Sequence, residues 1–166
     1  MNIVLTGFMG TGKSTIGKLL AEELKKDFID TDLFIERRYG KSIPQIFEEE
    51  GEERFRDLEV NVIKEIAKRK NAVISCGGGV VLNPVNVERL RKKGRIVLLT
   101  ASLEDIMKRI SEDRKRPLLR KYKIETLLKL REPIYFSVAD FIVNTTDVSV
   151  EETVNIIKGW YCGSHY

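Results

Sequence analysis

Residues 7–14 read GFMGTGKS and directly follow the apolar run NIVLT at residues 2–6. This stretch matches the pattern G-x-x-x-x-G-K-[ST], in which glycines allow backbone N–H groups to wrap around phosphates. The lysine of such a loop reaches the β- and γ-phosphate oxygens, and the hydroxyl after it can ligate Mg²⁺. A plain turn requires neither the Lys-Ser pair nor this spacing. The pattern predicts a loop that binds a nucleoside triphosphate through Gly10, Thr11, Gly12, Lys13, Ser14 and Thr15.

Two acidic residues end the second apolar run: Asp30 and Asp32 in DFIDTD, residues 27–32. In an extended chain, residues two apart point to the same side. A metal-positioning acid is expected at the end of a strand beside the phosphate loop, and the later strand-like runs end without one. The simpler alternative is an aspartate that caps the following helix, which would use only one of the two.

Two further segments place candidate substrate-binding groups beside glycine or proline residues, which restrict or free the backbone. Gly77-Gly78-Gly79 follow the third apolar run, where they form either a plain turn or a close backbone approach to a substrate. The segment REPIY places Arg131 two residues before Pro133. A proline inside a helix costs about 3 kcal/mol unless the helix bends or starts nearby.

Residues 108–123 form a basic segment, with eight Lys or Arg against two acids. Such a run is usually a solvated surface. Arg116, however, precedes Pro117 in RPLL, and this proline stiffens the chain beside the arginine. We therefore separate Arg116 from the rest of the segment as a candidate functional residue.

Composition places these motifs in one soluble domain of ordinary size: 166 residues, 42% apolar and 33% charged. The net charge of +4 suits a site for small anions as well as a nucleic-acid surface, and so does not distinguish them. No apolar run approaches the roughly 20 residues that cross a bilayer. Cys76 and Cys162 make no disulfide framework, so we expect two reduced thiols in a cytoplasmic protein.

Strand-like apolar runs alternate with helix-like segments along the chain. The expected strands cover residues 2–6, 27–32, 71–76, 95–100 and 140–144. Expected helix starts are marked by capping residues at Ser42, Asn83, Ser102 and Ser149, with Gly94 closing the helix that begins after Asn83. Five apolar strands alternating with amphipathic helices predict a parallel sheet covered on both faces, which is a three-layer α/β domain.

Together the segments resemble the shikimate kinase family over nearly the whole chain. GFMGTGKS, DTD, GEERFR, GGG, RPLL and REPIY follow in that family's order and at its approximate spacing. Many nucleotide-binding proteins share the glycine loop, whereas the combination of the other motifs is specific. The resemblance implies a P-loop kinase fold with strand order 2-3-1-4-5. It implies one domain over residues 1–166, with a substrate-binding segment at about 31–61 and a mobile lid at about 111–122.

The activity implied by this resemblance is ATP-dependent phosphorylation of the 3-hydroxyl of shikimate, with Mg²⁺, in aromatic amino-acid biosynthesis. The products would be shikimate 3-phosphate and ADP. The expected partners are ATP and shikimate alone, without nucleic acid or membrane, and the expected state is a cytoplasmic monomer.

On the acceptor side, the resemblance implies that Asp32 binds the substrate hydroxyls and orients or deprotonates the attacking one. Arg56 and Arg131 would bind the carboxylate, and the backbone of Gly77, Gly78 and Gly79 would contact the substrate. The residue chemistry agrees, since arginines suit a carboxylate and an aspartate suits neighbouring hydroxyls.

On the nucleotide side, the resemblance implies that Asp30 helps Ser14 to hold the Mg²⁺ shell. Lys13 and Arg116 would act on the transferring phosphate, with Arg116 supplied by the lid. Arg109 would stack on the adenine.

Other classes of protein predict features that differ from these. A gluconate kinase or a nucleoside monophosphate kinase would not need DTD together with Arg56 and Arg131, and an acceptor assay separates them. A GTP-dependent switch needs N-K-x-D and D-x-x-G motifs, which are absent from the sequence. A nucleic-acid module would interleave aromatic residues with the basic segment as stacking platforms, but aromatics are only 8% of the chain and do not follow that pattern.

Overall fold

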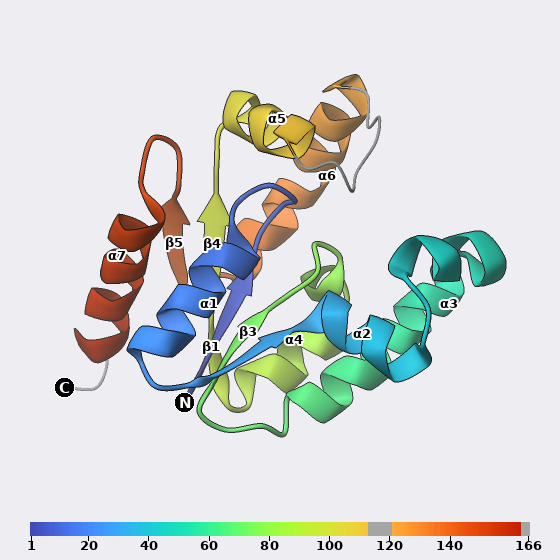
Figure 1. Cartoon of the computed structure of the whole chain (residues 1–166), viewed down its shortest axis with the longest axis horizontal. Helices are drawn as coiled ribbons and strands as arrows, with labels where there is room; N and C mark the ends of the chain where they lie inside the picture. Colours follow the sequence, from blue (N-terminus) through green and yellow to red (C-terminus); the bar gives the residue numbers. More distant parts are fainter. Residues whose placement is uncertain (113–120, 164–166) are drawn as a thin grey trace.

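Five short strands form one parallel sheet in the order β2-β3-β1-β4-β5, in a computed structural model that describes residues 1–112 and 121–163 (Figure 1). Neighbouring strands pair in parallel throughout. The predicted strand order is therefore confirmed. The strands are β1 (Asn2–Thr6), β2 (Asp27–Asp30), β3 (Ala72–Ser75), β4 (Gly94–Thr100) and β5 (Phe141–Asn144).

Helices connect these strands, because parallel neighbours require a crossover. They are α1 (Lys13–Glu23), α2 (Thr31–Tyr39), α3 (Ile43–Ile66), α4 (Pro84–Arg91), α5 (Leu103–Glu112), α6 (Lys121–Val138) and α7 (Val150–Gly163), with a 3₁₀ turn at η1 (Val80–Leu82). None of the described helices is long and apolar enough to cross a lipid bilayer.

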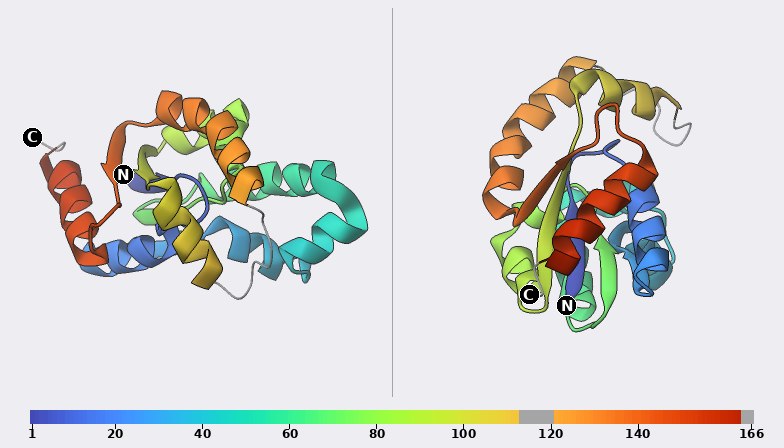
Figure 2. Two further views of the ribbon diagram at one scale, coloured as in Figure 1. Left: turned by 90° about the horizontal axis from the view of Figure 1, so that it is seen from above. Right: turned by 90° about the vertical axis from the view of Figure 1, so that its left-hand side faces the viewer.

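The sheet is buried on both faces, as its continuous apolar strands predict. In β1, Ile3 and Leu5 pack with residues of α1 and α7, whereas Val4 between them packs with residues of α3, α4 and α6. Figures 1 and 2 show α1 and α7 on one side of the sheet and α3 and α4 on the other. The predicted three-layer arrangement is confirmed.

Four helix starts lie where the capping residues predict them. Ser42 and Gln45 form a complete capping box, and the Asn83 side chain accepts the N–H of Val85 before α4. The hydroxyls of Ser102 and Ser149 accept the N–H groups of Asp105 and Glu152 in the first turns of α5 and α7. These contacts satisfy donors that a helix start would otherwise leave unpaired.

Two boundary predictions are wrong. The second strand ends at Asp30 rather than residue 32, because Asp30 Oδ1 accepts the N–H groups of Asp32 and Leu33 and starts α2. Asp32 is thus helical, and the two acids do not share one side of an extended strand. Gly94 does not close α4, which ends at Arg91; it begins β4, where it pairs with Asn2 of β1.

The long helix α3 is bent at Gly51, whose φ of 83° lies outside the helical region. The bend turns the segment before it back toward the segment after it. As a result the rings of Phe47 and Phe55 lie 4.7 Å apart, centre to centre. This bent helix forms one wall of the cavity described next.

The expected lid at about 111–122 lies largely outside the described residues, and Arg116 lies outside them entirely.

Candidate active site

The glycine loop joins the end of β1 to the start of α1, beside the carboxyl ends of the neighbouring strands (Figure 1). Gly10 and Gly12 have φ of 76° and 90°, a region that glycine enters without steric cost. The Lys13 ammonium donates to Gly7 O at 2.8 Å and Phe8 O at 2.7 Å, across the loop. The lysine ammonium therefore lies against the backbone of the loop, next to the start of α1, and helix starts of this kind attract phosphates.

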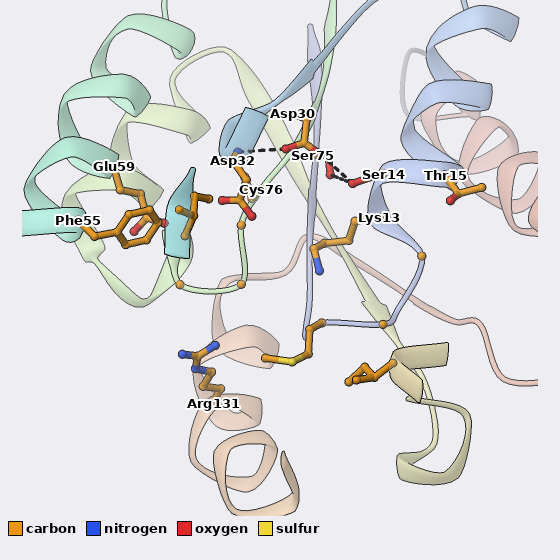
Figure 3. A pocket seen from close by; sticks show the side chains of 18 of the residues that line it. Lys13, Ser14, Thr15, Asp30, Asp32, Phe55, Glu59, Ser75, Cys76 and Arg131 are labelled. Atoms are coloured by element: carbon orange, nitrogen blue, oxygen red, sulfur yellow. Dashed lines mark hydrogen bonds between the residues drawn. The ribbon is translucent and has the colours of Figure 1, made fainter. Parts of the chain in front are cut away.

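A hydroxyl and a carboxylate meet where α1 begins. The Ser14 hydroxyl donates to Asp30 Oδ2 at 2.7 Å, and Ser75 Oγ lies 3.4 Å from Ser14 Oγ (Figure 3). The other oxygen of Asp30 caps α2, so one carboxylate both starts a helix and faces the phosphate loop. Clustered oxygens of this kind are the donors that Mg²⁺ prefers, so the residues fit that ion.

The Gly77–Gly79 turn at the end of β3 leaves little room for side chains, and each glycine faces a different charged group. A Cβ on Gly77 would overlap Asp32 Oδ1, and one on Gly79 would overlap Arg56 Nη1. A Cβ on Gly78 would stand 3.3 Å from Arg131 Nη1. The turn therefore contacts all three charged side chains, Asp32, Arg56 and Arg131, that the family resemblance assigns to binding of the acceptor.

Arg56 is held by Glu59, a residue that the sequence analysis missed. Its Nη1 donates to both carboxylate oxygens of Glu59, at 3.0 and 3.2 Å, one helical turn along α3. The Glu59 side chain is only 2% exposed. Burial raises the pKa of Glu59, and the adjacent Arg56 partly counteracts this rise. The sequence signal was the spacing of three residues in FRDLE, which places both side chains on one helix face.

Arg131 points from α6 into the cavity (Figure 3). Tyr135, four residues later on the same helix, donates its hydroxyl to Gly78 O at 2.7 Å. The sequence analysis quoted this tyrosine only as part of REPIY and assigned it no role. Pro133 lies inside the helix between the two residues.

These elements surround one cavity of about 350 Å³. Its lining includes the predicted residues Gly10, Gly12, Lys13, Ser14, Thr15, Asp30, Asp32, Arg56, Gly77, Gly78, Gly79, Arg109 and Arg131. Phe47 and Phe55 add an apolar wall. Cys76 also lines it, and burial raises the pKa of this thiol, so it remains neutral.

Two predicted nucleotide residues have structural contacts of their own. Thr11 does not line the cavity; it is buried, and its hydroxyl donates to Phe8 O at 2.8 Å within the loop. Arg109 lines the cavity and donates to Gly10 O at 3.1 Å and Thr145 O at 3.0 Å. It thereby ties the glycine loop to the loop after β5.

Comparison with known proteins identifies the family. The family model described as shikimate kinase matches residues 9–160. The chain belongs to the shikimate kinase family. A shikimate kinase of Caldanaerobacter subterraneus subsp. tengcongensis is 49% identical over 155 residues, covering 91% of this chain and 90% of the relative. One of Caldicellulosiruptor saccharolyticus is 50% identical over 154 residues, covering 90% and 89%.

Solved structures of shikimate kinases have the same architecture. The enzyme from Acinetobacter baumannii in complex with shikimate superposes with a TM-score of 0.92 at 38% identity, over 98% of this chain and 93% of that one. The enzyme from Aquifex aeolicus gives a TM-score of 0.88 at 38% identity, over 99% and 98%. The P-loop kinase fold predicted from the resemblance is therefore confirmed for this member of the shikimate kinase family.

Proposed function

We propose that this chain transfers the γ-phosphoryl group of ATP to the 3-hydroxyl of shikimate, giving shikimate 3-phosphate and ADP in aromatic amino-acid biosynthesis. One observation carries the proposal. The phosphate loop with Lys13 lines the same cavity as Asp32, Arg56 and Arg131. That arrangement suits a substrate that offers a hydroxyl to Asp32 and a carboxylate to two arginines. Membership of the family supports the same reaction.

At the nucleotide end, the glycine-loop N–H groups and the start of α1 attract the phosphates. Lys13 neutralises charge that grows on the phosphoryl oxygens during transfer. Ser14 and Asp30 would hold Mg²⁺ at the start of α1. The ion supplies electrostatic stabilisation of the phosphate oxygens when bound.

At the acceptor end, Asp32 accepts a hydrogen bond from the 3-hydroxyl and takes its proton as the oxygen attacks phosphorus. Arg56 and Arg131 bind the carboxylate and so fix which hydroxyl faces the nucleotide. Holding the attacking oxygen in line with the γ-phosphorus supplies much of the rate, because there is little other chemistry for the protein to do.

Three further assignments belong to this proposal. Arg116, assigned from the RPLL motif, contributes charge to the transferring phosphate as part of a lid at about 111–122. Arg109 flanks the adenine, which its position between the glycine loop and Thr145 supports. The chain acts as a single cytoplasmic domain and as a monomer.

The decisive experiment measures ADP release with ATP and Mg²⁺ while the acceptor is varied among shikimate, quinate, gluconate and AMP. We expect shikimate to give the highest kcat/KM and phosphorus NMR of its product to show a phosphate monoester on the 3-oxygen. Preferred turnover of gluconate or AMP would instead assign the chain a different acceptor.

A further inference from the structure

Tyr135 is a buried tyrosine whose polar end reaches the glycine turn. The residue is 2% exposed, and its hydroxyl donates to the carbonyl of Gly78 at 2.7 Å. Burial raises the pKa of Tyr135, with nearby Arg131 acting in the opposite direction. The phenol therefore keeps its proton and remains a donor at neutral pH.

The bonded carbonyl belongs to the peptide unit between Gly78 and Gly79. The chain has no cis peptide bonds among the described residues, so the N–H of Gly79 points opposite to the Gly78 carbonyl, away from Tyr135. No described residue accepts a hydrogen bond from the N–H of Gly78 or of Gly79. The Tyr135 hydroxyl thus sets the orientation of a peptide unit that lines the cavity.

This peptide unit also separates the two arginines. On one side, Arg56 Nη1 lies where a Cβ of Gly79 would stand. On the other, Arg131 Nη1 lies 3.3 Å from the Cβ position of Gly78. Arg131 and Tyr135 lie one turn apart on α6, so the hydrogen bond joins the turn to the helix that carries one of the arginines.

We propose that Tyr135 is a positioning residue that fixes the glycine turn between Arg56 and Arg131, and thereby sets the spacing at which the two guanidinium groups hold the acceptor carboxylate. This inference rests on the proposed function. It assigns Tyr135 to acceptor binding, because the glycine turn that it holds contacts both arginines.

A tyrosine that only fills the core would behave differently. Removal of its hydroxyl would then lower stability and change both substrates' KM values together or leave both unchanged. A positioning role changes the KM for shikimate more than the KM for ATP. This change in KM should also depend on the carboxylate of the acceptor, because the arginines bind the substrate through that group.

The test compares Tyr135→Phe with Tyr161→Phe. Tyr161 is a matched control: its hydroxyl also donates to a main-chain carbonyl, that of Met1 at 3.1 Å, but it lies on α7 across the sheet. Loss of the hydrogen bond that holds the Gly78 carbonyl should raise the shikimate KM of Tyr135→Phe about tenfold. We expect its ATP KM and kcat to stay within about twofold of the parent, as a bond confined to acceptor positioning implies. The control should match the parent in all three.

Two further measurements complete the test. Against an analogue whose carboxylate is reduced to a hydroxymethyl group, Tyr135→Phe should perform as the parent does. Hydrogen exchange in the substrate-free protein should be faster across residues 77–80 in Tyr135→Phe and unchanged in Tyr161→Phe. An unchanged shikimate KM, or equal rises in both KM values, overturns the inference.

The proposed function fails separately, through absence of shikimate turnover by the parent protein. In that case the exchange measurement still decides whether Tyr135 fixes the turn, because it uses no substrate.

Discussion

Asp32 and Gly77 lie so close together that a side chain at position 77 would displace the Asp32 carboxylate. A Cβ there would overlap Asp32 Oδ1, and the neighbouring Thr31 hydroxyl accepts the N–H of Gly77 at 2.8 Å. The first residue of the glycine turn is therefore tied to the first turn of α2, which carries the proposed catalytic carboxylate. The position of that carboxylate depends on the absence of a side chain 45 residues away in sequence.

Replacing Gly77 by alanine should lower kcat by on the order of 10²-fold, because a carboxylate displaced by about 1 Å no longer meets the attacking hydroxyl. The KM for ATP should hardly change. Steady-state kinetics on the purified variant measure both. Gly159→Ala is the matched control, since nothing lies within 4 Å of its Cβ position; equal activities of the two variants would contradict the role of Gly77.

Gly79→Ala should change the KM for shikimate and leave kcat almost unchanged. Its methyl group would displace Arg56, so we expect the KM for shikimate to rise. Weakening one charged contact to a carboxylate costs roughly 2 kcal/mol or more, which corresponds to a rise of about thirtyfold or more. The hydroxymethyl analogue, which has no carboxylate, should show little difference between variant and parent. A fall in kcat for both acceptors would contradict this assignment, because it would mean that Gly79 also controls the position of Asp32.

Asp30→Asn separates the two roles of this carboxylate. Asparagine caps helices as well as aspartate does, so α2 should persist while the charge facing Ser14 is lost. Loss of a group that supports the ligands of a metal typically lowers metal affinity about 10–100-fold, so the Mg²⁺ concentration for half-maximal activity should rise accordingly. Titration of Mg²⁺ at fixed ATP measures this. Asp27→Asn, at the exposed start of the same strand, should leave the Mg²⁺ requirement unchanged.

The raised pKa of Glu59 has a defined effect on stability against pH. The folded protein holds this proton more tightly than the unfolded chain, so the stabilisation is complete below the unfolded pKa and is lost as pH rises through the folded pKa. Glu59→Gln removes that dependence. The melting temperature of Glu59→Gln minus that of the parent should therefore increase between pH 4 and pH 7. A decrease over this range would show that pairing with Arg56 outweighs burial.

Much of the fold could be predicted from the sequence because the signals are local. The β1 strand at residues 2–6 and the capping box at Ser42 depend on neighbours within a few residues. The glycine loop is similar, since its phosphate-binding backbone is built from eight consecutive residues. Apolar alternation with helices was sufficient to predict a parallel three-layer domain.

The acceptor end of the cavity was only partly predictable, because its geometry depends on residues far apart in sequence. The resemblance to the family assigned Asp32 to a hydroxyl and Arg56 and Arg131 to a carboxylate, and the residue types agreed. Their arrangement follows from a turn whose three missing side chains make room for them.

Asp32 also shows how tertiary context changes a local prediction. An extended DTD was reasonable by propensity, but Asp30 caps α2 and rotates Asp32 into a helix. Similarly, the sequence assigned Tyr135 no role, because its bond to Gly78 joins residues 57 apart. The chain alone determined which chemical groups are present and which elements carry them. Only packing decided which groups meet, because a buried side chain's partners are set by elements that approach from elsewhere in the fold.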